Sequence, residues 1–319
     1  MPRYILKKLC QSLCTVLLVT FITFLLVYIM PGDAVSLMVD LQSADESVVQ
    51  ALREKYALDA PFLQQYFAWL GNIARGDFDT SLTYNAPVLG VVLKRLTVTL
   101  SMGGCSLLIS TGLGILLGFV AAECHGRWPD NLICVFSGAG TAMPPFLTAI
   151  VMILIFSVGL GLLPVQGYTD PSVDFWDHVR KMILPCMVAS FGGMMTVIRQ
   201  TRASLLETVN KDFIRTAIAK GLRRRDIRLR HLLRNAILPV LSLLGMQVGV
   251  LFGGMVVVEN IFNVPGMGSL VVTAVKNRDV PLIQMCILVM AVAMVLSTLA
   301  VDIAYGLIDP RMREVRADK

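Results

Sequence analysis

Charged residues are scarce in this chain. Lys, Arg, Asp and Glu make up 16% of its 319 residues, whereas soluble globular domains carry about 25%. Hydrophobic residues make up 55% of the chain, and its mean hydropathy is +0.71. This composition argues against a soluble globular domain and favours a membrane protein.

The charges that are present lie between long stretches that have none. Six charge-free stretches cover residues 9–32, 96–122, 131–169, 182–198, 235–258 and 280–301. A helix needs about 20 apolar residues, with a range of about 17–25, to cross the hydrocarbon core of a bilayer. The pattern therefore predicts an all-α integral membrane protein with six transmembrane helices. No small-x-small cleavage site follows the first stretch at Pro31-Gly32-Asp33, so we expect a retained helix and not a cleaved signal peptide.

Basic residues divide the connecting segments into two groups. Residues 1–8, 123–130, 199–234 and 302–319 carry 19 Lys and Arg, whereas residues 33–95, 170–181 and 259–279 carry 9. Because Lys and Arg accumulate in cytoplasmic loops, both termini are predicted to be cytoplasmic. This bias, together with attraction to anionic lipid, accounts for the net charge of +6 without any nucleic acid partner.

Motifs for covalent chemistry are missing from the sequence. No G-x-x-x-x-G-K-[ST] phosphate loop occurs, so the chain is not expected to hydrolyse ATP, and we predict no catalytic residue and no bound cofactor. A metal site at His125 would need three converging ligands, and His231 is expected to pack or hydrogen-bond. A transient metal contact is conceivable at His178, near Asp174 and Asp177, but no metal site is predicted. Six of the seven cysteines lie in or beside apolar stretches, and no disulfide is expected. Ionisable residues within the spans are few, which leaves an ion-coupled secondary transporter as the less favoured alternative.

The external segment after the first span, residues 33–95, is too long for a simple connection. Ser47–Leu58 and Phe62–Ile73 alternate apolar and polar residues at helical spacing. We expect short amphipathic helices at the outer surface. Surface packing and docking of another protein would both account for them.

Glycine and proline mark packing within the predicted spans. Gly114 and Gly118 form a GxxxG pair, which predicts a close helix contact. Pro144-Pro145 predicts a kink or break in the third span, which could line a water-filled pathway or be structural. The fourth span is predicted to be short and to begin at Leu184-Pro185. The residues predicted to line a translocation path are Pro144, Pro145, Met246, Gln247 and Met255.

The most informative segment joins the fourth and fifth spans on the cytoplasmic side, over residues 199–235. Its first 36 residues carry eleven basic and three acidic side chains. Apolar residues recur at intervals of three and four and form one face of a predicted amphipathic helix: Phe213, Ile214, Ala217, Ile218 and Leu222. The helix is predicted to end at Gly221, which suits a left-handed cap. Such a helix could rest on anionic lipid or dock into a groove of a cytoplasmic partner, and composition leaves both open.

The same segment resembles a known family motif. The run Asp212-Phe213-x-Arg215-Thr216-Ala217-x-Ala219-Lys220-Gly221-Leu222, followed by Arg230-His231-x-x-Arg234-Asn235-Ala236-x-Leu238-Pro239, resembles the EAA loop of ABC-importer permeases, and more narrowly that of the dipeptide, oligopeptide and nickel branch. Further matching fragments occur in order: Pro31-Gly32-Asp33, Leu58-Asp59-x-Pro61, Gly76-Asp77-Phe78, Glu259-Asn260-x-Phe262-x-x-Pro265-Gly266, Asn277-Arg278-Asp279-x-Pro281 and Asp309-Pro310-Arg311. Asp79 stands where glycine is commoner in that branch.

The resemblance implies a fold division, a site and partners. Residues 1–95 would form the first span and the external segment, and residues 96–319 a five-helix permease core. Such a subunit pairs with a second homologous permease, two cytoplasmic ATPase subunits and an extracytoplasmic solute-binding protein in the bacterial cytoplasmic (inner) membrane, with ATP and Mg bound by the ATPases. The residues implied to form the coupling helix are Asp212, Phe213, Arg215, Thr216, Ala217, Lys220, Gly221 and Leu222. Dipeptides and oligopeptides are the first expected cargo, with nickel, a metal chelate and glutathione left open.

Overall fold

The computed structural model describes residues 2–29, 50, 60–227 and 232–308. The chain divides into two compact units, one made of Met1–Thr99 and Pro265–Leu296 and the other of Leu100–Val264 and Ser297–Lys319. Several sequence predictions lie outside the described residues: Pro31-Gly32-Asp33, Leu58-Asp59, Arg230-His231, Asp309-Pro310-Arg311 and, except for residue 50, the helix expected over Ser47–Leu58.

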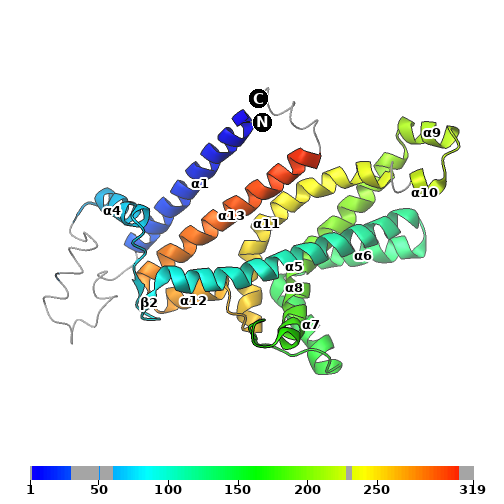
Figure 1. Cartoon of the computed structure of the whole chain (residues 1–319). Helices are drawn as coiled ribbons and strands as arrows, with labels where there is room; N and C mark the ends of the chain where they lie inside the picture. The colour runs from blue at the N-terminus through cyan, green and yellow to red at the C-terminus, as the bar shows by residue number, and fades with distance from the viewer. Residues whose placement is uncertain (1, 30–49, 51–59, 228–231, 309–319) are drawn as a thin grey trace. The chain divides into compact units, whose positions relative to one another are not determined.

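Long apolar helices account for the predicted spans (Figure 1). Four are long and apolar enough to cross a bilayer: Cys10–Ile29 of α1 (Pro2–Ile29), α5 (Val88–Glu123), α8 (Phe175–Val209) and Val280–Val301 of α13 (Val280–Ile308). Two further candidates are bent, one of them within α11 (Arg234–Phe262), where the helix bends by 56° between Ser242–Gly249 and Gly253–Phe262. The described residues thus contain four candidate spans, or up to six if each bent pair is one span. An all-α membrane protein is confirmed, and the six-span topology stays a prediction.

The other bent candidate breaks at the double proline. It joins α6 (Trp128–Ala142) to α7 (Pro145–Met152) and the π-helix η1 (Ile153–Gly159), and the chain bends by 118° between its two halves. Met143 and Pro144 have extended backbones, with ψ of 122° and 149°. Proline lacks an N–H and disfavours helical conformation in the residue before it, so the helix ends there and restarts at Pro145. The predicted break is confirmed.

In the unit that contains α1, the N-terminal parts of α5 and α13 pack around the short helix α12 (Met267–Lys276). Their shared core consists of Val88, Val92, Met267, Leu270, Ala274, Leu282, Ile283, Met285 and Cys286. The predicted amphipathic helix at Phe62–Ile73 is confirmed as α4 (Phe62–Ala74), which packs against α1.

A small hairpin in the same unit is held by a buried carboxylate. The strands β1 (Thr80–Ser81) and β2 (Ala86–Pro87) pair antiparallel, with Thr80 opposite Pro87. The side chain of Asp279 is buried, and its Oδ2 accepts hydrogen bonds from the Ser81 hydroxyl at 2.6 Å and from the Thr83 N–H at 2.9 Å. Asp79, just before the hairpin, has φ of 63°. This left-handed backbone explains why glycine is the commoner residue there.

In the other unit, glycines bring α5 and α6 close to α8. A Cβ added at Gly118 of α5 would lie 2.7 Å from the Ile198 carbonyl oxygen, and one added at Gly140 of α6 would lie 2.8 Å from the Met195 side chain. In an apolar stretch of 18 residues of α8, 56% of the stretch is buried. The close contact predicted for the GxxxG pair is confirmed, and its partner is α8.

The helix α8 begins earlier than predicted. Asp174 caps its N-terminus, and the Asp174 carboxylate accepts hydrogen bonds from the N–H groups of Trp176 at 2.9 Å and Asp177 at 3.0 Å. Pro185, the predicted start, lies inside the helix. The prediction was wrong because a proline inside a membrane helix can be accommodated by its neighbours, and because the capping carboxylate determines where the helix starts.

Candidate functional site

The segment between α8 and α11 contains the predicted helix. It is α9 (Asp212–Ala219), and the three-residue helix α10 (Arg224–Asp226) follows it. After α9 the Gly221 N–H donates to the Ile218 carbonyl at 2.9 Å, and Gly221 has φ of 71°. Since only glycine adopts this left-handed conformation readily, the predicted glycine cap is confirmed.

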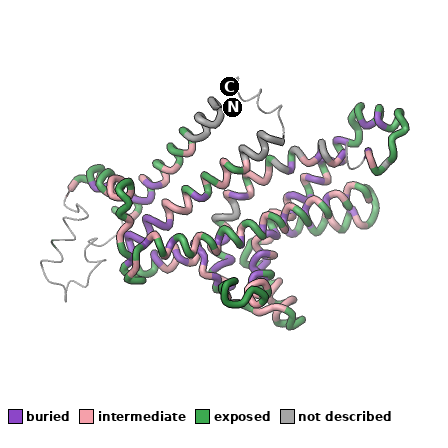
Figure 2. The backbone as a smooth tube through the Cα atoms, in the orientation of Figure 1, coloured by how far each residue is buried: buried purple, intermediate pink, exposed green. Residues whose placement is uncertain are grey.

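The five residues of the predicted apolar face, four in α9 and Leu222 after it, are divided between two environments. Ile214 and Ala217 are buried in a cluster with Leu205, Ile227, Leu232 and Ala236, against which Phe119 and Ala122 of α5 also pack. Phe213, Ile218 and Leu222 are 40%, 62% and 42% exposed. Figure 1 shows α9 and α10 beyond the ends of α8 and α11, and Figure 2 shows both buried and exposed positions along α9. The predicted single apolar face is therefore only partly covered by the chain itself, because α9 is short and only one side of it meets other helices.

Charged side chains on α9 and just before it are open to solvent. Arg215 Nη1 lies 3.7 Å from Asp212 Oδ1, and Lys211 Nζ lies 3.1 Å from Glu207 Oε1. All four side chains are at least half exposed, and exposed ion pairs of this kind contribute about 0–1 kcal/mol to stability. The charges therefore remain available for pairing with another surface.

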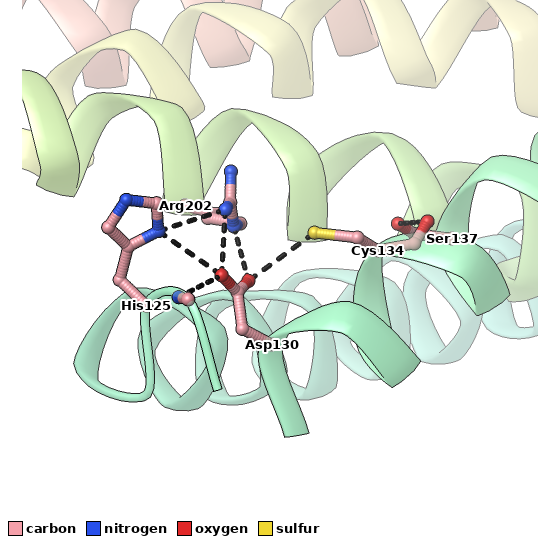
Figure 3. A network of polar contacts seen from close by, with 6 residues as sticks. His125, Asp130, Cys134, Ser137 and Arg202 are labelled. Atoms are coloured by element: carbon pink, nitrogen blue, oxygen red, sulfur yellow. Dashed lines mark hydrogen bonds and ion pairs between the residues drawn. The ribbon is translucent and has the colours of Figure 1, made fainter. Parts of the chain in front are cut away.

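The buried carboxylate of Asp130 in α6 contacts α8 and the loop before α6 (Figure 3). Its contact on α8 lies two turns before the end of that helix. Arg202 of α8 donates through Nε to Asp130 Oδ1 at 2.6 Å and through Nη2 to Asp130 Oδ2 at 2.8 Å. The Gly126 N–H donates to Asp130 Oδ2 at 2.9 Å, and the Cys134 thiol donates to Oδ1 at 3.4 Å. His125 Nδ1 lies 3.2 Å from Asp130 Oδ2 and 3.1 Å from Arg202 Nη2. We call Asp130 and Arg202 the α6–α8 ion pair.

Sequence reasoning missed this pair. Asp130 precedes one charge-free stretch, and Arg202 follows another by a few residues. Opposite charges at the ends of two predicted spans indicate that the two residues could pair. The sequence does not show which charges pair, because Asp130 and Arg202 are 72 residues apart. His125 stands out in the sequence only as a possible metal ligand. Among the described residues, no group of three or more His, Cys, Asp and Glu could hold a metal ion.

The predicted path residues lie in different surroundings. Pro144 and Pro145 are exposed at the bend between α6 and α7. Gln247 of α11 donates through Nε2 to the Gly193 carbonyl of α8 at 3.1 Å. Met255 is buried, and its Cε would lie 2.8 Å from a Cβ at Gly103 of α5. Met246 is exposed, and a path-lining role for the five stays a prediction.

The loop before α8 ties its polar side chains to one another. His178 Nδ1 lies 2.7 Å from the Thr169 carbonyl oxygen, and Lys181 Nζ donates to Asp177 Oδ2 at 2.7 Å. The Ser172 hydroxyl and N–H both donate to Asp170, and this holds the pKa of the Asp170 carboxyl below its usual range. These contacts attach the loop to the first turns of α8, and we assign them a structural role.

Several helices long and apolar enough to cross a membrane, together with the family match that follows, place the chain among transport permeases, a class that is not one of enzymes. The chain belongs to the family of binding-protein-dependent transport system inner membrane components, whose model matches residues 114–314, while the N-terminal model of the same system matches residues 1–103. Membership implies ABC-transporter partners such as a binding protein and an ATPase.

Similar chains support this assignment over their full length. A Brucella ovis chain with the provisional name of peptide permease protein is 37% identical, covering 98% of this chain and 99% of its own. A Sinorhizobium fredii chain named as a probable peptide ABC transporter permease protein is 36% identical over 98% and 100%. The glutathione transport system permease protein of Escherichia coli is 36% identical over 98% and 99%.

Proposed function

We propose that this chain forms the translocation path of an ATP-driven importer for dipeptides and oligopeptides, which an extracytoplasmic solute-binding protein delivers. A second homologous permease and two cytoplasmic ATPase subunits would complete the assembly, with ATP and Mg bound on the ATPases and no cofactor on this chain. Relatives named as peptide permeases support the cargo. The observation that carries the mechanism is the two-sided packing of α9.

One side of α9 would attach it to the permease and the other to the ATPase. Ile214 and Ala217 pack into the cluster formed with α8, α11 and α5, so α9 cannot shift without moving these helix ends. Phe213, Ile218 and Leu222 present exposed apolar surface that fits a groove in a partner. The coupling residues would be these three together with Asp212, Arg215, Thr216, Lys220 and Gly221 and, from the buried side, Ala217.

ATP-driven closure of the ATPases would then displace α9 and rotate the attached helices as a rigid body. The α6–α8 ion pair would carry that movement to α6, because a bidentate Arg–carboxylate contact resists both sliding and rotation. The bend at Pro144 would move with α6 and change the path.

The excess of Lys and Arg around α9 supports a cytoplasmic location for this segment and hence for both termini. The family's description as an inner membrane component supports the bacterial inner membrane as the location of the chain. Lipid would surround the assembly, and nucleic acid would have no role.

Glutathione is the second cargo candidate, because one relative is named as a glutathione permease. Nickel or a metal chelate would use the same mechanism. An ion-coupled secondary transporter is the alternative outside this class, and it would take up solute without any ATPase.

Uptake into vesicles that contain this chain, its partner permease, the ATPases and the binding protein tests the proposal. Labelled dipeptide, glutathione and nickel are offered separately, with and without ATP. We expect ATP-dependent dipeptide uptake. ATP-dependent uptake of nickel or glutathione alone would replace the cargo, and uptake without ATPases would contradict the mechanism.

A pair of matched substitutions tests the contact itself. Ile218→Asp should abolish uptake and co-purification of the ATPases while leaving the amount of chain in the membrane unchanged, because Ile218 is 62% exposed. Val173→Asp makes the same chemical change at an exposed position in the loop before α8 and should leave co-purification intact. Equal retention of the ATPases by both variants would contradict the docking role of α9.

A further inference from the structure

The helix α4 packs along one half of α1 through aromatic side chains. The Phe62 ring lies 5.1 Å from the Tyr28 ring near the end of α1. Tyr66 reaches further along α1, where its hydroxyl lies 3.1 Å from Thr20 Oγ1 and donates to the Leu17 carbonyl at 3.3 Å. The contacts of α4 thus extend from one end of the α1 span to its interior.

These contacts fix the depth of α4 relative to the α1 span. The apolar span of α1 is Cys10–Ile29, so Thr20 lies at its middle. The eight residues from Thr20 to Tyr28 extend over about 12 Å of helix, and half of the hydrocarbon core is about 15 Å thick. Side chains of α4 therefore reach acyl-chain depth whichever end of α1 is cytoplasmic. A helix at that depth is not surrounded by bulk water.

Apolar side chains lie on the outer side of α4 as well as on the side that packs against α1. Phe62–Ala74 contains no charged residue. Leu63 and Phe67, one turn apart, are 55% and 64% exposed, with Gln64 and Ala68 beside them. The amide of Gln65, in contrast, is on the buried side. A helix whose outer side faced water would carry polar and charged residues there, and the outer side of α4 has no charge.

Some of the backbone groups that flank α4 have hydrogen-bond partners within the chain. Gln65 Nε2 donates to the Ala60 carbonyl at 2.9 Å, just before the helix. After the helix, the Arg75 N–H donates to the Gly71 carbonyl at 3.1 Å and the Asp77 N–H to the Asn72 carbonyl at 3.0 Å. Unpaired backbone groups are costly in hydrocarbon. Charge resumes at Arg75, directly after the last helical residue, as expected where a chain returns to the headgroups.

We infer that α4 is embedded in the bilayer leaflet that surrounds the C-terminal half of α1, with Leu63 and Phe67 against lipid acyl chains. In this position α4 acts as an interfacial anchor for the segment between the first span and α5. The inference needs only that α1 spans the membrane. It does not depend on the cargo or on the ATPases.

Single-tryptophan quenching in vesicles tests the inference. The full chain with its partner subunits is reconstituted in phosphatidylcholine, with or without lipid brominated on the acyl chains. Trp69→Phe, Trp128→Phe and Trp176→Phe remove the native indoles, and Phe67→Trp places one on the exposed side of α4. Leu26→Trp, at a 64% exposed position within the α1 span, serves as the lipid reference. Val173→Trp, at an exposed loop position between Asp170 and Asp174, serves as the aqueous reference.

We expect brominated lipid to quench Phe67→Trp as strongly as Leu26→Trp, and aqueous iodide to leave both unchanged. Quenching by iodide at the level of Val173→Trp would overturn the inference and place this side of α4 in water, open to a binding protein. Protection from both quenchers would also overturn it, because a protein partner would then cover the helix. Should Phe67→Trp fail to assemble, Leu63→Trp, one turn earlier on the same side, gives the same test.

Discussion

Substituting Asp130 with asparagine removes the charge of the α6–α8 ion pair while nearly keeping its shape. The Asp130 side chain is 2% exposed and that of Arg202 is 25% exposed. The amide oxygen of the new side chain could accept one of the two Arg202 hydrogen bonds, but its NH₂ group would meet the second donor. Removing one partner of a buried pair costs about 3–5 kcal/mol. Since Arg202 keeps a quarter of its surface in solvent, we expect the lower end of that range.

Thermal unfolding of the purified complex in detergent measures this loss. A loss of about 3 kcal/mol should lower the unfolding midpoint by about 6 °C, given that each kcal/mol shifts a large domain by about 2 °C. His125→Ala is the matched control, because the His125 ring also contacts Asp130 but is 60% exposed. We expect it to cost less than about 1 kcal/mol.

A double-mutant cycle decides whether the pair itself is responsible. Arg202→Met leaves the Asp130 carboxylate buried without its cation and should be at least as destabilising as Asp130→Asn. The double variant should be more stable than the sum of the two single losses predicts, with a coupling energy of about 2 kcal/mol. A coupling energy within about 0.5 kcal/mol of zero would refute the reasoning, since that is the scatter between independent sites.

Three further perturbations have defined outcomes. Gly118→Ala should cost about 1–3 kcal/mol in the same unfolding assay, because the added Cβ would lie 2.7 Å from a carbonyl oxygen of α8; Gly104→Ala, where the Cβ would meet open space, should not be destabilising. Asp279→Asn should speed hydrogen exchange in the β1–β2 hairpin, which loses the carboxylate that accepts two of its hydrogen bonds, and unchanged exchange would contradict that role. Gly221→Ala should lower uptake per ATP hydrolysed without reducing the amount of chain in the membrane, because a φ of 71° costs a Cβ-bearing residue about 1–2 kcal/mol and re-aims the chain after α9.

Features that depend only on residues close together in the sequence could be predicted from it. Charge-free stretches located the long apolar helices, because hydrocarbon excludes charge whatever the tertiary structure. The break at Pro144 and the left-handed cap at Gly221 followed from the backbone chemistry of single residues. Helical periodicity found α4 and α9 for the same reason.

Features that depend on which distant segments meet could not be predicted. The α6–α8 ion pair joins residues 72 apart, and the contact between Ser81 and Asp279 joins residues 198 apart. Periodicity also identified the apolar face of α9 without showing how much of it the chain covers. Ile214 and Phe213 are adjacent and equally apolar, and only the packed structure separates the buried residue from the exposed one.

The two-sided packing of α9 separates two kinds of selection on one short helix. Substitutions at Ile214 or Ala217 are tested by the folding of the permease, whereas under the proposed docking role those at Phe213, Ile218 and Leu222 would be tested by fit to the ATPase. The three exposed positions would then change together with the gene of that partner while the membrane core stays constant. Under the same proposal, exchanging only these three side chains between related permeases would change which ATPase a permease binds, and would allow transporters to be built that work side by side in one cell.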